Sequence, residues 1–231
     1  MDVRIESLLE GAARASGAVA IIDVLRAFTT AAVAFANGAT RIAMVASVEE
    51  ALVLRAQGAG QICMGEVGGR PPKSFDYGNS PYELSKVDLT GVEIIQRTSA
   101  GTQGIVTAAK EAQSMFAASL VTASATARAL RSLAGGRITL VAMGEEGRVR
   151  SSEDEVCALY LRNLLLEGRG GNPDAARQMI LSGGEVAKFN DVTRPWLNPN
   201  DVPLALDIDR YDFAVRVIIE HGYPVARKFE A

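Results

Sequence analysis

Short hydrophobic runs alternate with longer amphipathic or alanine-rich segments along most of the chain. The short runs are typical of buried strands and the longer segments of helices. The expected strands are Ala18–Val24, Arg41–Val45, Gln61–Gly65, Val92–Gln96, Met115–Ser119 and Arg137–Met143. The expected helices are Ala27–Asn37, Ser47–Gln57, a segment from the turn Arg97–Gly104 to about Ala112, Ser124–Leu133, Glu153–Glu167 and Pro173–Ser182. This alternation predicts an α/β fold with a parallel or mixed sheet and helices on both sides.

Two stretches depart from the alternation. Residues 66–81 are rich in glycine and proline and carry several charged and amide side chains, which is typical of a binding loop. In the C-terminal tail, Pro203–Ile208 is expected to form a strand, and Phe213–Ile219 and Pro224–Phe229 a hairpin around Gly222. His221 is then an exposed turn residue.

The domain organisation leaves two arrangements open. The 231 residues fit one large domain, 1–231, or two closely packed lobes. Ile21–Ile22 and Ile94–Ile95 each belong to a buried strand followed by polar residues that include an arginine, Arg26 or Arg97. This likeness is consistent with an old internal duplication.

The charge, the hydrophobic stretches and the cysteines of the chain indicate which partners and which cellular compartment to expect. The net charge is −3 and the basic residues are spread along the chain, which argues against nucleic acid or an anionic membrane as the main partner. The apolar stretch 18–36 contains Asp23 and Arg26, so we interpret it as a buried strand and helix and not a membrane span. Two distant cysteines and an acidic start without a signal peptide favour a cytoplasmic protein with reduced thiols.

Chemically active residue types follow four of the expected strands. In open α/β sheets the carboxyl ends of the strands are where ligands bind. The residues expected there are Asp23 and Arg26 after the first strand, Glu66, Asp76 and Asn79 after the third, Arg97, Thr98, Ser99, Gly101 and Thr102 after the fourth, and Asp154 after the last. Their repetition at one kind of position predicts a single polar, anion-attracting cleft.

The segment Arg97–Gly104 is the expected anion site. It is rich in glycine and hydroxyl groups and enters a helix, whose N-terminal N–H groups favour negative charge. Arg26 and Arg97 could each grip a phosphate with a forked pair of hydrogen bonds. The absence of a Gly-Lys-Ser/Thr sequence disfavours a nucleotide triphosphate. The alternative interpretation is a glycine turn beside a structural arginine.

Four carboxylates are candidates for binding Mg²⁺, namely Asp23, Glu66, Asp76 and Asp154. Mg²⁺ prefers oxygen ligands, and the chain has one histidine and no cysteine pair at metal-ligand spacing, which disfavours zinc. Each carboxylate also has a structural interpretation. Asp23 could pair with Arg26, Asp76 could be a turn residue, and Glu153 and Asp154 suit the positive end of a helix dipole.

At these strand ends the sequence resembles the 2-phosphosulfolactate phosphatase family, the ComB-like proteins. The matching stretches are Asp23–Thr30, Gly65-Glu66, Phe75–Pro81, Arg97–Gly104, Ser152–Cys157 and the tail around Ala205–Phe213. The resemblance implies a three-layer α/β/α fold and Mg²⁺-dependent hydrolysis of (R)-2-phospho-3-sulfolactate, a step of coenzyme M biosynthesis. Some members carry Thr-Asn-Gly-Thr where this chain has Thr98-Ser99-Ala100-Gly101-Thr102, which bears on the substrate.

The resulting hypothesis gives each candidate a role. Asp23, Asp76 and Arg97 are the expected catalytic residues, with Asp76 orienting the attacking water or Asp23 forming an aspartyl-phosphate. Arg26, Asn79, Thr98 and the Ser99–Thr102 backbone are expected to bind the phosphorylated substrate. The alternatives are a phospho-ligand binding or regulatory protein without turnover, and a phosphatase of another small organic phosphate. A homodimer is a further expectation.

Overall fold

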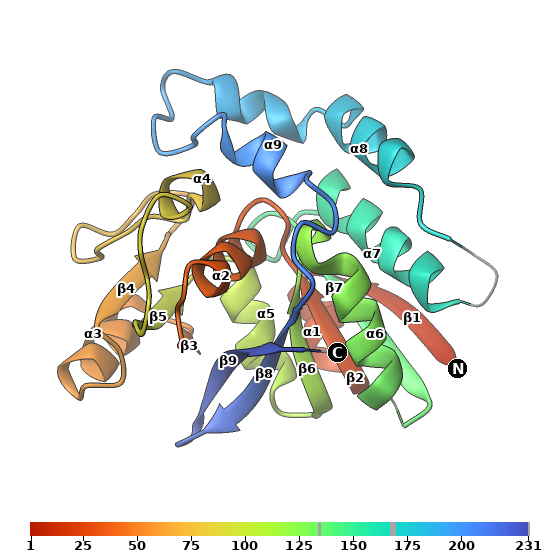
Figure 1. Ribbon diagram of the computed structural model, residues 1–231, viewed down its shortest axis with the longest axis horizontal. Coiled ribbons are helices and arrows are strands. Elements are labelled where there is room, and N and C mark those ends of the chain that lie inside the picture. The colour runs from red at the N-terminus through yellow and green to blue at the C-terminus, as the bar shows by residue number, and fades with distance from the viewer. Residues whose placement is uncertain (134, 167–169, 231) are drawn as a thin grey trace.

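A nine-stranded mixed sheet forms the centre of the protein, in the strand order β1-β7-β2-β6-β8-β9-β3-β5-β4. The computed structural model describes residues 1–133, 135–166 and 170–230 (Figure 1). The strands are β1 (Asp2–Ser7), β2 (Gly17–Ile22), β3 (Arg41–Val45), β4 (Ile62–Gly65), β5 (Glu93–Arg97), β6 (Ala112–Ala118), β7 (Arg137–Ala142), β8 (Ala214–Glu220) and β9 (Tyr223–Phe229). The predicted α/β class with a mixed sheet is confirmed.

The C-terminal hairpin joins two groups of parallel strands. Within β1-β7-β2-β6 and within β3-β5-β4 all pairings are parallel. β8 lies antiparallel to β6, and β9 lies antiparallel to β3. The hairpin was predicted from the sequence, and its turn includes exposed His221 with a φ of 52°. β2 belongs to one parallel group and β5 to the other, while the duplication itself stays a prediction.

Helices cover both faces of the sheet, which confirms the three-layer α/β/α arrangement. The alternation of side chains along β2 shows this directly. Val19 and Ile21 pack with α1 (Leu8–Arg14), α2 (Ala27–Ala36) and α5 (Gly101–Ala108) on one face. Ile22 packs with α6 (Ala123–Leu133) and α7 (Ser152–Leu165) on the other. α3 (Val48–Ala56) covers the outer part of this second face, beside β3 and β5.

A set of short helices lies beyond the carboxyl ends of the parallel strands (Figure 1). It comprises α4 (Pro81–Leu84), α8 (Pro173–Ser182), a 3₁₀ helix η2 (Glu185–Asn190) and α9 (Asp201–Ala205), and a further 3₁₀ turn, η1 (Leu120–Thr122), follows β6. The predicted strand Pro203–Ile208 is wrong, because this segment begins as α9. Pro203 stands in the first helical turn, where a missing N–H costs nothing.

The N-terminal elements β1 and α1 were not predicted from the sequence. In β1 the apolar Val3 and Ile5 alternate with charged residues, the pattern of a half-buried edge strand. The predicted end of α7 at Glu167 lies outside the described residues. Both cysteines are buried and free, as expected. Among the described helices, none has the length and apolar character needed to cross a membrane.

Candidate active site

A cavity of about 390 Å³ opens where the strand ends meet the short helices and their loops. Its walls come from four strand ends, those of β2, β4, β5 and β7, and from the segment 188–197. The lining residues are Asp23, Leu25, Arg26, Glu66, Gly68, Gly69, Arg70, Asn79, Ser99, Ala100, Gly144, Glu145, Glu146, Glu153, Lys188, Phe189, Arg194, Trp196 and Leu197. The predicted convergence of separate strand ends therefore holds for part of the candidate set.

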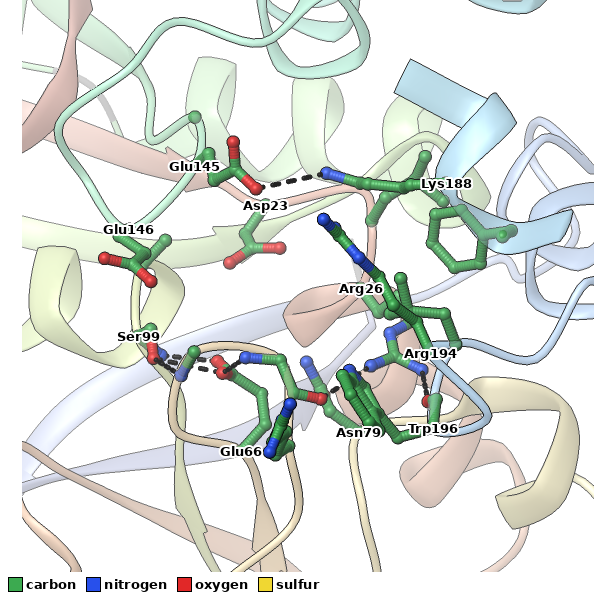
Figure 2. A pocket seen from close by; sticks show the side chains of 18 of the residues that line it. Asp23, Arg26, Glu66, Asn79, Ser99, Glu145, Glu146, Lys188, Arg194 and Trp196 are labelled. Atoms are coloured by element: carbon green, nitrogen blue, oxygen red, sulfur yellow. Dashed lines mark hydrogen bonds and ion pairs between the residues drawn. The ribbon is translucent and has the colours of Figure 1, made fainter. Parts of the chain in front are cut away.

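Most of the charged side chains that Figure 2 labels lie on two facing sides of the cavity. The acidic residues that line it are Asp23, Glu66, Glu145, Glu146 and Glu153, and the basic ones are Arg26, Arg70, Lys188 and Arg194. Figure 2 shows Glu145, Glu146 and Asp23 facing Lys188, Arg26 and Arg194 across the open space. One ion pair bridges the sides, with Lys188 Nζ 3.7 Å from Glu145 Oε1.

Asp23 lies at the end of β2 and is buried. Its Oδ1 accepts the backbone N–H of Ala27 at 2.9 Å, and its Oδ2 accepts that of Gly101 at 2.8 Å. Burial raises the pKa of Asp23 to about 6, the two N–H bonds oppose that shift, and the charge of Glu66 adds to it. The carboxylate is held rigidly between the first turns of α2 and α5.

Glu66 lies just after β4 and folds over the start of α5. Its Oε1 accepts the backbone N–H of Ser99 at 2.5 Å. Its Oε2 accepts the Ser99 hydroxyl at 3.0 Å and the Gly69 N–H at 2.6 Å. The side chain thereby fixes both the loop after β4 and the turn before α5.

The start of α5 differs from the anion cradle expected from the sequence. Its N–H groups at Ser99 and Gly101 are bonded to Glu66 and Asp23, and that of Thr102 to the Thr98 hydroxyl. Thr98, Gly101 and Thr102 are buried and do not line the cavity, whereas Ser99 does. The positive end of the helix does attract anions, but these anions are the protein's own carboxylates.

Two of the three predicted catalytic residues lie outside the cavity. Arg97 donates to the carbonyl oxygens of Ala46 and Glu66 and to Ser99 Oγ, so it supports the wall from behind. The placement of Asp76 in the common cleft is wrong. Its Oδ2 accepts the Cys63 N–H at 2.8 Å and pairs with Arg55 at 3.0 Å, because the chain after the glycine-rich loop returns to pair with the edge strand β4.

Asp154 and Glu153 occupy the start of α7 with different surroundings. Asp154 is buried behind the cavity, where its two oxygens accept the N–H groups of Val24 and Gly144 at 2.8 Å each. Burial, together with the charges of Glu153 and Asp23, raises the pKa of Asp154. Glu153 lines the cavity, and its buried Oε2 has no hydrogen-bond partner in the described structure. Burial raises the pKa of Glu153 to about 7.

Arg26 and Asn79 both line the cavity, while their predicted role in substrate binding stays a prediction. Arg26 Nη1 donates to the carbonyl oxygen of Trp196 and to Asp201, each at 2.9 Å. The carbonyl oxygen of Gly69 lies 3.5 Å from Nη2. Asn79 Oδ1 is buried without a hydrogen-bond partner among the described residues, so this acceptor is unused by the protein.

Sequence reasoning missed most of the basic side. Arg70 lies in the glycine-rich loop that was predicted to bind a ligand, and its guanidinium stacks 4.2 Å from the ring centroid of Trp196. Lys188, Arg194 and Trp196 come from a segment without helical or strand periodicity. The cluster of basic and aromatic residues just before Pro199 was the only available signal for this wall.

The carboxylate oxygens in the cavity are suitable ligands for a hard cation such as Mg²⁺, but they do not form a complete coordination shell. In the described part of the chain, no three His, Cys, Asp or Glu side chains converge on one point. Mg²⁺ is commonly held by one or two carboxylates while water and substrate oxygens complete its shell. Asp23, Glu66 and Glu153 line the cavity together, and Glu153 Oε2 has no hydrogen-bond partner among the described residues. These residues fit Mg²⁺ bound jointly by protein and ligand.

An α/β sheet with a cavity of charged side chains at its strand carboxyl ends is typical of the class of proteins that bind a small charged ligand. The sequence profile of a family described as 2-phosphosulpholactate phosphatase matches residues 4–191. A "probable 2-phosphosulfolactate phosphatase" of Bacillus subtilis is 30% identical over 204 residues, which cover 85% of each chain. The chain therefore belongs to the 2-phosphosulpholactate phosphatase family, which confirms the resemblance found in the sequence.

Two further relatives carry the same description. The Thermus thermophilus protein is 35% identical over 152 residues, 66% of this chain, and the match spans 61% of the relative's length. The Thermotoga petrophila protein is 36% identical over 162 residues, which are 70% of this chain and 69% of the relative. The family name is that of a phosphoric monoester hydrolase.

Proposed function

We propose that the protein is an Mg²⁺-dependent phosphatase of small acidic phosphomonoesters, with 2-phosphosulfolactate as the first candidate substrate. The observation that carries the proposal is the division of the cavity into an acidic and a basic side. A cation and a multiply charged anion fit such a site together, whereas a neutral ligand would bring no opposite charge to the buried carboxylates of Asp23 and Glu66. The names of the relatives supply the candidate substrate.

Binding of the substrate falls to the basic side. The exposed Arg70 and Arg194 and the half-buried Lys188 line the cavity, where they can meet the acidic groups of the ligand. For Lys188 and Arg194 such a contact competes with ion pairs within the protein, to Glu145 and Glu185 and to Asp191. Arg26 is oriented by three protein acceptors and offers its remaining N–H groups to phosphoryl oxygens. Oriented guanidinium groups stabilise the charge that builds on a transferring phosphoryl group.

On the acidic side, Asp23 and Glu66 would hold the cation, which when bound supplies positive charge against the phosphate oxygens. Glu153 is the base that we assign to the reaction, because it lines the cavity, its Oε2 has no hydrogen-bond partner among the described residues, and its pKa of about 7 suits proton transfer near neutral pH. A bond forms between water oxygen and phosphorus as the ester P–O bond breaks. The water proton moves to Glu153 Oε2 and returns to the leaving oxygen.

Attack by Asp23 to form an aspartyl-phosphate is the alternative chemistry. Both Asp23 oxygens accept a backbone N–H bond, at 2.9 Å and 2.8 Å. Such bonds stabilise the carboxylate charge and lower its nucleophilicity, so they favour attack by water. Trapping of a phosphorylated Asp23 during turnover would contradict the water mechanism.

Release of inorganic phosphate tests the proposal. We expect release from 2-phosphosulfolactate and 2-phospholactate in the presence of Mg²⁺, loss of release in EDTA, and restoration by added Mg²⁺. Phenyl phosphate, which lacks a second acidic group, should show a higher KM because it leaves part of the basic side unpaired. Activity that persists in EDTA would overturn the metal dependence. Binding of inorganic phosphate without turnover of any ester would overturn the hydrolase assignment.

A further inference from the structure

Asp201 is a buried carboxylate outside the segment matched by the family profile. It stands at the first position of α9, and its side chain is fully shielded from solvent. Its Oδ2 accepts Arg26 Nη1 at 2.9 Å. Its Oδ1 accepts the Ser80 hydroxyl at 2.6 Å and the Tyr82 N–H at 3.1 Å. One carboxylate thus ties α9 and the start of α4 to an arginine of the cavity.

The contacts of Arg26 divide its guanidinium into two parts. Both N–H groups of Nη1 are used by the protein, one on Asp201 and one on the Trp196 carbonyl oxygen. One N–H of Nη2 points to the Gly69 carbonyl oxygen at 3.5 Å. The other Nη2 hydrogen and the Nε hydrogen have no acceptor in the described parts of the chain. Arg26 lines the cavity, so its Nε hydrogen and its second Nη2 hydrogen are the ones that a ligand can use.

The buried position of the Arg26 guanidinium depends on the negative charge of Asp201. The Arg26 side chain is only 4% exposed, and a buried guanidinium without a counter-charge is strongly disfavoured. The only carboxylate that the structure pairs with Arg26, among the described residues, is Asp201. The Trp196 and Gly69 carbonyl oxygens add direction but no full charge. Asp201 therefore determines both the burial and the rotation of the guanidinium plane.

We propose that Asp201 is a positioning residue, which holds the Arg26 guanidinium so that its free N–H groups face the phosphoryl group. The proposal rests on the proposed function, because it requires a phosphorylated ligand in the cavity. Asp201 does not line the cavity and acts through Arg26. The C-terminal segment that carries α9 is thereby part of the machinery of the site, although it lies beyond residues 4–191.

A double-mutant cycle tests this coupling. Asp201→Asn is expected to lower kcat/KM by about 10- to 100-fold, the usual effect of removing a partner that orients a site residue. Arg26→Ala is expected to cost at least as much. The double variant Arg26→Ala/Asp201→Asn should have the same kcat/KM as Arg26→Ala alone, because Asp201 has nothing left to orient. A purely structural role would instead make the two losses multiply.

Two variants serve as controls. Asp207→Asn breaks an exposed ion pair with Arg210 shortly after α9 and should leave kcat/KM unchanged. Ser80→Ala removes another partner of Asp201 but keeps Arg26 paired, and it should cost far less activity than Asp201→Asn. An equal loss in Ser80→Ala would overturn the proposal. Circular dichroism and Tm of every variant establish that the fold is kept.

Arg26→Lys tests the role of the oriented guanidinium group while Asp201 is kept, so it remains informative if Asp201→Asn does not fold. It keeps the positive charge but has a single nitrogen, and we expect kcat to fall as far as in Arg26→Ala. Wild-type activity in Arg26→Lys would overturn the proposal. As a readout without turnover, inorganic phosphate is titrated against the fluorescence of Trp196, the only tryptophan in the sequence. Asp201→Asn should weaken this binding by the same factor as Arg26→Lys.

The outcomes separate this inference from the function on which it rests. A wild-type protein that neither hydrolyses phosphoesters nor binds phosphate overturns the proposed function and the inference with it. An active wild-type protein together with an unchanged Asp201→Asn variant overturns the inference alone. Multiplying losses in the double-mutant cycle do the same.

Discussion

Asp23→Asn is expected to lower kcat/KM for phosphoester hydrolysis by about 10³-fold, the order of magnitude expected when electrostatic stabilisation of a phosphoryl group is lost. Asn removes the charge that we assign to holding Mg²⁺. A neutral side chain avoids the cost of burying a charge, which already raises the pKa of Asp23 to about 6, but Asn can accept only one of the two backbone N–H bonds of Ala27 and Gly101. Steady-state kinetics at several Mg²⁺ concentrations, with Tm as the fold control, measure both effects.

Asp76→Asn is the matched control, since the sequence alone placed Asp23 and Asp76 in one site. Asp76 lies outside the cavity and pairs with Arg55 at the edge of the sheet. We expect its kcat/KM to stay within about twofold of the wild type, which is the usual effect of a change far from the reacting groups. Equal losses in the two variants would contradict the site drawn from the structure.

Glu153→Gln is expected to raise the free energy of unfolding at pH 8 by about 3 kcal/mol, at 1.36 kcal/mol for each unit of pKa shift. Burial raises the pKa of this carboxyl from 4.5 to about 7. Below pH 4.5 the folded and unfolded states are both protonated, and the group costs nothing. As the pH rises from 4.5 to 7, only the unfolded state ionises, so the wild type loses stability until the loss levels off above pH 7. Gln has no proton to lose.

Thermal or urea unfolding at pH 5, 6, 7 and 8 in EDTA measures this effect. The difference in stability between Glu153→Gln and the wild type should grow across that series, and activity should be lost at every pH because the base is gone. Glu155→Gln is the control on the same helix turn, where the carboxylate already accepts the Ser7 hydroxyl at 2.7 Å. A stability difference that does not change with pH would contradict a raised pKa of the buried Glu153.

The strand–helix alternation could be predicted because each core strand carries its own signal. β3 and α8 have the predicted bounds, and β2 and α2 differ from them by one or two residues. Those segments are buried on one or both faces, so their hydrophobic pattern is strong. The signal failed at Pro203–Ile208, where a short apolar run with a proline looks the same whether it forms a strand or the first turn of a helix.

The candidate site was predictable on its acidic side and not on its basic side. Asp23 and Glu66 directly follow buried strands, so their place at the edge of the sheet follows from the chain order. Asp76 was misplaced because it is ten residues beyond Glu66, and a loop of that length can return to the sheet. Lys188 and Arg194 lie in a segment whose path depends on how α8 and η2 pack, which no local pattern encodes.

The sequence by itself determined the α/β layering, the C-terminal hairpin and the set of strand ends at which polar residues gather, because periodic burial and chain order are local properties. Only the tertiary structure decided which polar residues share a cavity. In the folded chain, the N–H groups at the start of α5 bind the carboxylates of Glu66 and Asp23. The side chain of Asp201 pairs with Arg26. Such contacts join residues far apart in the chain, where the free energy of charge burial, and not the local pattern, selects the partner.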